Sequence, residues 1–350
     1  MSYARVRHPA ARVAAIVIIA LTAVALSAGD VDARGKKKKK RVVYRPALAH
    51  IVLDAKTGKT LETYKADEKR YPASLTKVMT LYLLFERIEA GELKLNSQLS
   101  VSRHASSRPP TKLGLKPGDT VRVEDAIKAL VTKSANDVAV VVAEAIGGSE
   151  AEFARMMTDK ARALGMDSTV YTNASGLPDS KQFTTARDQA VLGSVIQQHF
   201  PRHYRYFATT SFTFRGRKIH THNKVLEQVK GVDGIKTGYI YASGFNLVTS
   251  VRRNLRHIVA VVIGGRTSRS RDAFMRTLIH NYINKAASIR VVSPAAAMAS
   301  GVIDPDDLPL PPPRPESPVV ADFPLNQVLD ANEFAPLQTE MAPASISAQR

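Results

Sequence analysis

Ser74 and Lys77 lie three positions apart. The hydroxyl of the first and the amine of the second could together form an activated nucleophile. The apolar spacing that follows predicts a helix from Ser74 to about Ala90. Residues i and i+3 lie on one face of a helix, so we expect the amine to reach the hydroxyl. Ser74 would lie in the first turn, where free backbone N–H groups favour an oxyanion. Alone the pair is a weak signal, because Ser-x-x-Lys also occurs on ordinary solvated helices.

A second hydroxyl and an amide occur at Ser134-Ala135-Asn136, where two predicted helices meet. Here Ser134 could pass a proton between Lys77 and a leaving amine, while the Asn136 amide holds Lys77 or the substrate backbone. The simpler interpretation is a serine that caps a helix, followed by an ordinary asparagine. This element supports catalysis only in combination with the first.

The third element is Lys236-Thr237-Gly238-Tyr239, which we expect at the edge of a strand. Lys236 and Thr237 can bind a substrate carboxylate there, and Gly238 allows the backbone to approach closely. The N–H groups of Tyr239 and Ser74 are the candidate oxyanion donors. The same letters occur at Lys56-Thr57-Gly58, where we expect only a hairpin turn.

The elements that must position these residues alternate between strand and helix patterns. We predict strands at 48–53 and 60–64, an irregular stretch at 96–123, helices at 123–132, 136–146, 149–164 and 185–199, strands at 207–214, 244–251 and 256–264, and a last helix at 271–285. The pattern indicates an α+β fold. In it, both ends of the domain form one antiparallel sheet with helices on its faces, and the central helices form a mainly helical subdomain.

The 350 residues divide by composition into four parts. Residues 1–28 join arginines to an apolar run and predict a signal peptide, and 29–44 form a basic flexible segment. Residues 45–290 form the catalytic domain, and 291–350 a disordered tail rich in proline and alanine. That tail is a poor match for a basic amphipathic membrane-binding helix.

The chain has a net charge of +19 and contains no cysteine. The charge limits which classes of partner we expect. A basic exported domain favours anionic partners, either a cell-wall polymer with free carboxylates or anionic lipid headgroups. We expect a periplasmic protein that makes peripheral contact with the inner membrane, and no nucleic-acid partner. None of the nine histidines forms a metal-binding motif, so neither a metal nor a cofactor is expected.

The three elements occur in the order found in the serine D-Ala-D-Ala carboxypeptidases, the low-molecular-mass penicillin-binding proteins of peptidase family S11. The resemblance rests on Ala73-Ser74-Leu75-Thr76-Lys77, Ser134-Ala135-Asn136-Asp137 and Asp233-Gly234-Ile235-Lys236-Thr237-Gly238-Tyr239. The connecting segments Leu113-Gly114-Leu115-Lys116-Pro117-Gly118-Asp119 and Asn173-Ala174-Ser175-Gly176-Leu177-Pro178-Asp179 are also similar to that family. The resemblance covers roughly residues 45–285 and implies the β-lactamase/DD-transpeptidase-like fold.

The resemblance also implies a reaction and a role for each residue. Ser74 attacks the bond between the two D-alanines that end a peptidoglycan stem pentapeptide, Lys77 takes its proton, and Ser134 relays that proton to the departing D-alanine. Water then hydrolyses the acyl-enzyme. Asn136, Lys236, Thr237, Gly238 and Tyr239 bind the substrate, and β-lactams act as covalent inhibitors.

Three alternatives stay open at this point. A serine β-lactamase shares the motifs, but its commonest class adds a glutamate for deacylation, and this chain has none between Glu152 and Glu227. A DD-endopeptidase would use the same site on cross-linked peptides, and a non-catalytic wall-binding homologue would only retain the fold. Two departures from the family pattern, Ala135 and the stretch 240–244, remove no catalytic group.

Overall fold

The computed structural model describes residues 46–288 of the chain. The predicted signal peptide (1–28), the basic segment (29–44) and the tail (291–350) lie outside the described residues. Within 46–288, no helix combines the length and apolar character needed to cross a membrane.

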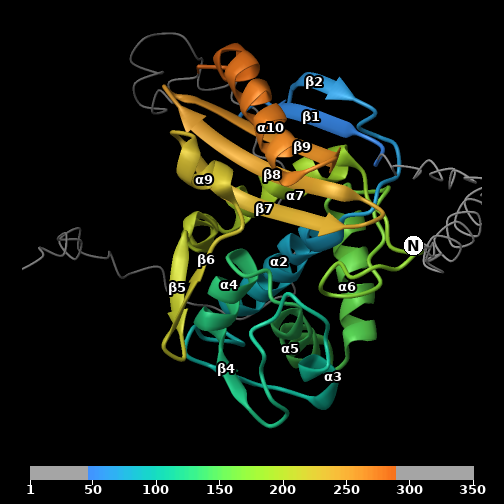
Figure 1. Cartoon of the computed structure of the whole chain (residues 1–350), viewed down its shortest axis with the longest axis vertical. Helices are drawn as coiled ribbons and strands as arrows, with labels where there is room; N and C mark the ends of the chain where they lie inside the picture. The colour runs from blue at the N-terminus through green and yellow to red at the C-terminus, as the bar shows by residue number, and fades with distance from the viewer. Residues whose placement is uncertain (1–45, 289–350) are drawn as a thin grey trace, which may run out of the picture. The chain divides into compact units, whose positions relative to one another are not determined.

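Strands from both ends of the described chain form one five-stranded antiparallel sheet, as predicted (Figure 1). Its order is β2-β1-β9-β8-β7, with the bounds β1 Ala49–Asp54, β2 Thr60–Tyr64, β7 Val232–Ile240, β8 Gly244–Arg253 and β9 Arg256–Gly265. All six residues of β1 are buried, which fits an apolar strand that is paired on both sides. β7 is an edge strand, so one of its two sides is not paired with another strand of this sheet.

Helices cover both faces of the sheet (Figure 1). α10 (Ser268–Tyr282) packs on one face, where Met275 and Ile279 meet Val262 in an apolar cluster. α7 (Ala186–His199) packs on the other face. It comes close enough that a Cβ on Gly193 would lie only 3.0 Å from the Val248 side chain. Packing on both faces therefore holds the sheet, including its β7 edge, in a fixed position.

The remaining helices form a mainly helical region beyond the β7 edge (Figure 1). Its elements are α2 (Thr76–Glu89), α3 (Arg103–Ser106), α4 (Val123–Val131), α5 (Asn136–Gly147), α6 (Glu150–Ala163) and the two-stranded sheet of β3 (Gln98–Ser100) and β4 (Thr120–Arg122). The first ten residues of α2 are all buried, because this helix packs against α4, α5, α6 and α7. α2 thus connects the helical region to the sheet.

Two predicted elements are wrong in detail. The stretch 207–214 is not one strand: η2 (Arg205–Ala208) is a 3-10 turn, and β5 (Ser211–Phe214) then pairs with an unpredicted strand, β6 (Arg217–His220). Arg215 and Gly216 form the connecting turn with φ of 47° and 76°, which is hairpin geometry that arginine rarely indicates. The irregular stretch 96–123 contains α3, β3 and β4.

The beginning of the α2 helix also differs from the prediction. Ser74 lies in η1 (Ala73–Leu75), a 3-10 turn, and α2 begins only at Thr76. Ala73 has a φ of +50°, so the chain turns sharply just before the serine. The short helices α8 (Pro201–Tyr204) and α9 (Lys224–Gln228), and the turn η3 (Ile283–Lys285), complete the described structure.

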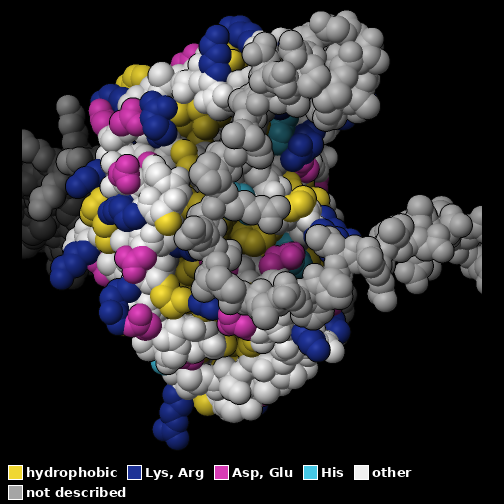
Figure 2. Space-filling model, turned by 180° about the vertical axis from the view of Figure 1, so that it is seen from behind, with side chains coloured by type: hydrophobic (Ala, Val, Ile, Leu, Met, Phe, Trp, Pro, Cys, Tyr) yellow, Lys and Arg dark blue, Asp and Glu magenta, His cyan; other side chains and the backbone are white. Residues whose placement is uncertain are grey.

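Charged side chains of both signs share the surface. On the face turned away from Figure 1, Lys and Arg lie interspersed with Asp and Glu (Figure 2). Ion pairs such as Lys160–Glu86 at 2.7 Å and Arg187–Asp67 at 2.6 Å neutralise positive charge locally. Surface pairs of this kind contribute only about 0–1 kcal/mol each to stability.

Candidate active site

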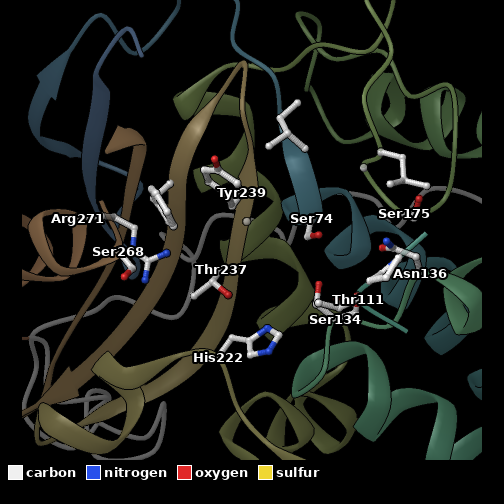
Figure 3. A pocket seen from close by; sticks show the side chains of 16 residues that line it. Ser74, Thr111, Ser134, Asn136, Ser175, His222, Thr237, Tyr239, Ser268 and Arg271 are labelled. Atoms are coloured by element: carbon white, nitrogen blue, oxygen red, sulfur yellow. Dashed lines mark hydrogen bonds between the residues drawn. The ribbon is translucent and has the colours of Figure 1, made fainter. Parts of the chain in front are cut away.

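A pocket of about 370 Å³ lies between the β7 edge and the helical region. Figure 3 shows Thr237 and Tyr239 on the strand side, and Ser74, Ser134 and Asn136 on the opposite side. Three segments that are far apart in the sequence therefore meet at one cavity. The repeated letters at Lys56-Thr57-Gly58 lie instead in the exposed turn between β1 and β2.

Ser74 and Lys77 are in hydrogen-bonding contact, with 3.2 Å between Oγ and Nζ. The side chain of Lys77 is completely buried in the first turn of α2, while Ser74 remains partly exposed and lines the pocket. The 3-10 turn keeps the two side chains on one side of the chain even though the α-helix begins after Ser74. The serine thus faces the pocket, and the amine lies behind it.

The amine of Lys77 has two further partners. It donates to Asn136 Oδ1 at 2.8 Å and to the backbone carbonyl of Ser175 at 2.5 Å. A neutral amine has two hydrogens and one lone pair. If both hydrogens go to these two acceptors, the lone pair is left for the hydroxyl of Ser74. The contacts therefore match a neutral lysine that accepts a proton from the serine.

Burial lowers the pKa of Lys77 well below its usual range, and the nearby positive charge of Lys236 lowers it further. The negative charges of Asp137 and Glu150 act in the opposite direction and raise this pKa. A buried ammonium with a cationic neighbour loses its proton readily, so the surroundings favour the form of Lys77 that can act as a base.

Ser134 is held in a backbone conformation that serine seldom adopts, with a φ of +59°. Its carbonyl accepts a hydrogen bond from Thr111 Oγ1 at 3.0 Å. Its hydroxyl is buried and has no hydrogen-bond partner among residues 46–288. Figure 3 shows Ser134 beside Ser74 at the pocket. An unsatisfied hydroxyl at this position is available to a substrate.

Asn136 and its neighbour Asp137 fix the wall of the pocket on this side. Asn136 Nδ2 donates to the carbonyl of Pro109 at 2.9 Å, which orients Oδ1 towards Lys77. The buried carboxylate of Asp137 accepts hydrogen bonds from the backbone N–H groups of Leu113 at 3.0 Å and Gly114 at 2.8 Å. The start of α5 thus holds the loop between α3 and β4 in place.

On the opposite wall, Lys236 and Thr237 face different surroundings. Lys236 is buried, does not line the pocket, and donates to the carbonyl of Thr237 at 2.9 Å. Burial and the charge of Arg271 lower the pKa of Lys236 to about 7. Thr237 does line the pocket. The structure therefore brings Lys236 to the site as a charge behind the wall rather than as an exposed clamp.

The rest of this strand shapes the wall of the pocket beside the serine. A Cβ on Gly238 would lie 3.1 Å from the backbone nitrogen of Ser74, so glycine permits the close approach of β7 to the serine turn. Tyr239 is 51% exposed, and its ring lies 4.3 Å from that of Phe245. These two rings pack against each other and line the pocket.

The contact between the Ser175 carbonyl and Lys77 was not predicted from the sequence. Asn173 Oδ1 accepts hydrogen bonds from the backbone N–H groups of Ser175, Gly176 and Leu177, which closes a tight turn. Gly176 has a φ of +81°, and a Cβ there would lie 1.8 Å from the carbonyl oxygen of Ala73. The only signal in the sequence was the resemblance of the segment 173–179 to the family pattern.

Arg271 and His222 also line the pocket, and neither was predicted. Arg271 is buried, pairs with Asp272 at 2.6 Å, and donates to the carbonyl of Asn246 at 2.9 Å. Partial desolvation and the charges of Lys236 and Lys133 lower the pKa of His222 to about 4, so this ring is neutral at pH 7. Single residues outside a motif give no signal in the sequence, which is why both were missed.

The chain resembles proteins of known class over this whole region. It is 35% identical over 232 residues to D-alanyl-D-alanine carboxypeptidase DacC of Escherichia coli, an alignment that covers 64% of this chain and 58% of that protein. It is 31% identical to DacF of Bacillus subtilis over 65% of this chain and 59% of that protein. The chain thus spans less than two thirds of the length of these relatives.

Solved structures agree with this likeness. Penicillin-binding protein 5 of Haemophilus influenzae has a TM-score of 0.65 at 29% identity and covers 68% of this chain and 70% of its own. Penicillin-binding protein D2 of Listeria monocytogenes, in its cefotaxime-bound form, has a TM-score of 0.61 at 28% identity over 68% of this chain and 97% of its own. The α+β fold predicted from the sequence is therefore confirmed. The D-alanyl-D-alanine carboxypeptidase family model matches residues 37–267, a span that includes Ser74, Ser134 and Lys236, and the chain belongs to this peptidase family, S11.

Proposed function

We propose that this protein is a serine D-Ala-D-Ala carboxypeptidase that removes the terminal D-Ala from peptidoglycan stem pentapeptides through an acyl-enzyme on Ser74. The observation that carries the proposal is the set of contacts of Lys77. Two acceptors, Asn136 Oδ1 and the Ser175 carbonyl, and one hydroxyl, that of Ser74, surround its buried amine. This set fits a neutral base aimed at a nucleophile.

In the first step, Ser74 Oγ attacks the carbonyl carbon of the penultimate D-Ala while Lys77 Nζ accepts the hydroxyl proton. The C–N bond then breaks, and the leaving nitrogen takes a proton from Lys77 through the hydroxyl of Ser134. That hydroxyl lines the pocket and has no partner within the described structure, so it is free to contact a bound substrate. In the second step, water hydrolyses the ester and releases the shortened peptide and Ser74.

Backbone donors and the charge near β7 complete the reaction site. The N–H groups of Ser74 and Tyr239 would receive the oxyanion, because β7 passes close to the serine turn at Gly238. Thr237 and Arg271 line the pocket and would bind the terminal carboxylate, with the charge of Lys236 behind them. A peptide without a free C-terminal carboxylate would lose these interactions, which gives exopeptidase selectivity.

The surroundings of Glu150 are consistent with a slow turnover of β-lactams, because both oxygens of this carboxylate are engaged within the protein. They contact the N–H of Ala174 at 3.2 Å and the ring of His104 at 2.7 Å. Both contacts are structural. The charge of Glu150 affects Lys77 only by raising its pKa. The sequence contains no glutamate between Glu152 and Glu227 that could take the place of a deacylating base. We therefore expect β-lactams to act as covalent inhibitors rather than as substrates.

Two measurements test the proposed function. Labelled penicillin should acylate the wild-type protein in a one-to-one ratio and should fail to label Ser74→Ala, with Ser107→Ala as a control on an exposed serine. Free D-Ala should then be released from a stem pentapeptide. If the pentapeptide stays intact while cross-linked dimers are cleaved, the protein is an endopeptidase and the proposal is wrong.

We also infer that the protein is exported and acts in the periplasm, from the signal-like pattern of residues 1–28. A basic exported chain has the charge for peripheral contact with the anionic inner membrane. Fractionation of cells in low and high salt tests both inferences. Recovery in the cytosolic fraction would overturn the first, and a salt-independent distribution would overturn the second.

A further inference from the structure

A second pocket, of about 450 Å³, lies next to the first and is lined mainly by basic side chains. We call it the basic pocket. Its cationic residues are Lys112, Lys133, Arg215, Arg217 and Lys218. They come from the loop between α3 and β4, the turn before α5 and the β5–β6 hairpin, which is at the left of Figure 1.

Three of these cations have no ion pair within residues 46–288. Arg215 pairs with Asp119 at 3.0 Å, and Lys112 donates to the carbonyl of Ser106 at 3.0 Å. In contrast, no acidic side chain lies within ion-pair distance of Lys133, Arg217 or Lys218 in the described part of the chain. Elsewhere on the surface, acidic side chains accompany many of the positive charges (Figure 2). The basic pocket therefore concentrates positive charge that the protein itself leaves uncompensated.

The two pockets share their dividing wall. Lys112 and Lys133 line the basic pocket, whereas the adjacent residues Thr111 and Ser134 line the substrate pocket. His222, two residues beyond the end of β6, lines the substrate pocket as well. Its pKa is lowered by desolvation, by Lys236 and by Lys133, so the charge of Lys133 acts across the wall. A ligand held in the basic pocket would thus lie next to the reaction site.

We propose that the basic pocket binds a peptidoglycan peptide carboxylate other than the terminal carboxylate of the peptide that is cleaved. The ligand class is a carboxylate on a flexible peptide, supplied either by the same stem peptide or by a neighbouring one in the polymer. This inference rests on the proposed function for its choice of ligand. Lys133, Arg217 and Lys218 hold the carboxylate by charge-assisted hydrogen bonds.

The first experiment measures binding without catalysis. The full chain with Ser74→Ala is mixed with isolated peptidoglycan sacculi, and bound protein is measured by sedimentation at low and high salt. Adding Lys133→Gln, Arg217→Gln and Lys218→Gln should weaken binding at low salt by about tenfold, and high salt should remove the difference. A matched control, Lys59→Gln, Lys94→Gln and Lys285→Gln, removes three exposed charges elsewhere and should weaken it less than twofold.

Amidated sacculi identify the chemical class of the ligand. Once the peptide carboxylates are converted to amides, the two triple variants should bind equally. Equal binding to native sacculi would overturn the proposal. So would a difference between the variants that persists on amidated sacculi, because it would indicate a ligand such as phosphate. A melting temperature within a few degrees of wild type shows that each variant is folded.

The second experiment distinguishes the two sources of the carboxylate. D-Ala release is compared for soluble pentapeptides that carry either a carboxylate or an amide upstream of the scissile bond. If the pocket variant loses the preference of the wild type for the acidic peptide, the carboxylate belongs to the same stem peptide. If only sacculus binding is affected, it belongs to a neighbouring peptide. Failure of the wild type to release D-Ala from either peptide would overturn the proposed function but leave the binding result intact.

Discussion

The backbone carbonyl of Ser175 accepts a hydrogen bond from Lys77 Nζ at 2.5 Å, across a separation of 98 residues in the chain. The carbonyl is presented by a turn that Asn173 closes. Gly176 in that turn packs directly on the carbonyl of Ala73, beside Ser74, the proposed nucleophile. The proposed reactivity of Ser74 thus depends on a loop that holds no member of the three sequence motifs.

The first prediction concerns this packing. Gly176→Ala should lower the melting temperature by more than about 8 °C, because the new Cβ would clash with Ala73 and glycine's positive φ would become strained. Acylation by labelled penicillin should slow by at least about tenfold, because the loop must move away from Lys77. Thermal unfolding and labelling kinetics measure the two effects.

Gly91→Ala is the matched control for Gly176→Ala. Gly91 has a φ of +75°, but a Cβ there meets no atom within 4 Å. The control therefore isolates the backbone strain, and it should lower the melting temperature by only about 2–4 °C. If the two variants unfold at the same temperature, the contact between Gly176 and Ala73 does not matter for stability.

The second prediction concerns the base. Lys77→Met should slow acylation by labelled penicillin by about 10²–10⁴-fold, the usual range for loss of a general base. Lys94→Met, at an exposed lysine, is the control and should acylate at the wild-type rate. Stopped-flow or quenched labelling provides the rate. Acylation of Lys77→Met at more than a tenth of the wild-type rate would mean that another group removes the proton.

The third prediction follows from the charge of Lys236. The pKa of Lys236 is about 7, so the free protein loses this positive charge as the pH rises through that value. kcat/KM for a pentapeptide should therefore fall on the alkaline side near pH 7, and the alkaline limb should disappear in Lys236→Gln. Burial and Lys236 lower the pKa of Lys77, so removal of the charge should also move the acid limb to higher pH. An unchanged acid limb would show that Lys236 does not influence the base.

The fourth prediction concerns Asp137, whose removal should shift the acid limb in the opposite direction to the removal of Lys236. Burial and Lys236 lower the pKa of Lys77, whereas Asp137 raises it, so Asp137→Asn should shift the acid limb of penicillin acylation to lower pH. The variant should also lose about 1–3 kcal/mol of stability, because an amide cannot accept all the backbone N–H groups that the carboxylate accepts. Asp159→Asn, at an exposed carboxylate, should do neither. A shift to higher pH would contradict the assigned effect.

Much of the fold could be predicted from the sequence. Apolar periodicity indicated α2, α5 and α7, and the strand patterns at both ends indicated the shared sheet. Local patterns failed where a tertiary contact decides the conformation. The β5–β6 hairpin turns at Arg215, which is not a typical turn residue, and η1 precedes α2 because Ala73 adopts a positive φ against Gly176.

By itself, the sequence determined which chemical groups are available, because motif spacing places Ser74 beside Lys77 and names Ser134, Asn136 and Lys236 as their partners. Only the tertiary structure decided how these groups differ. It buries Lys236 behind the pocket wall, leaves the hydroxyl of Ser134 without a partner among residues 46–288, and brings the Ser175 carbonyl to Lys77. The physical reason is that burial, charge and hydrogen-bond partners are set by segments distant in the chain, and these set the pKa values on which the chemistry depends.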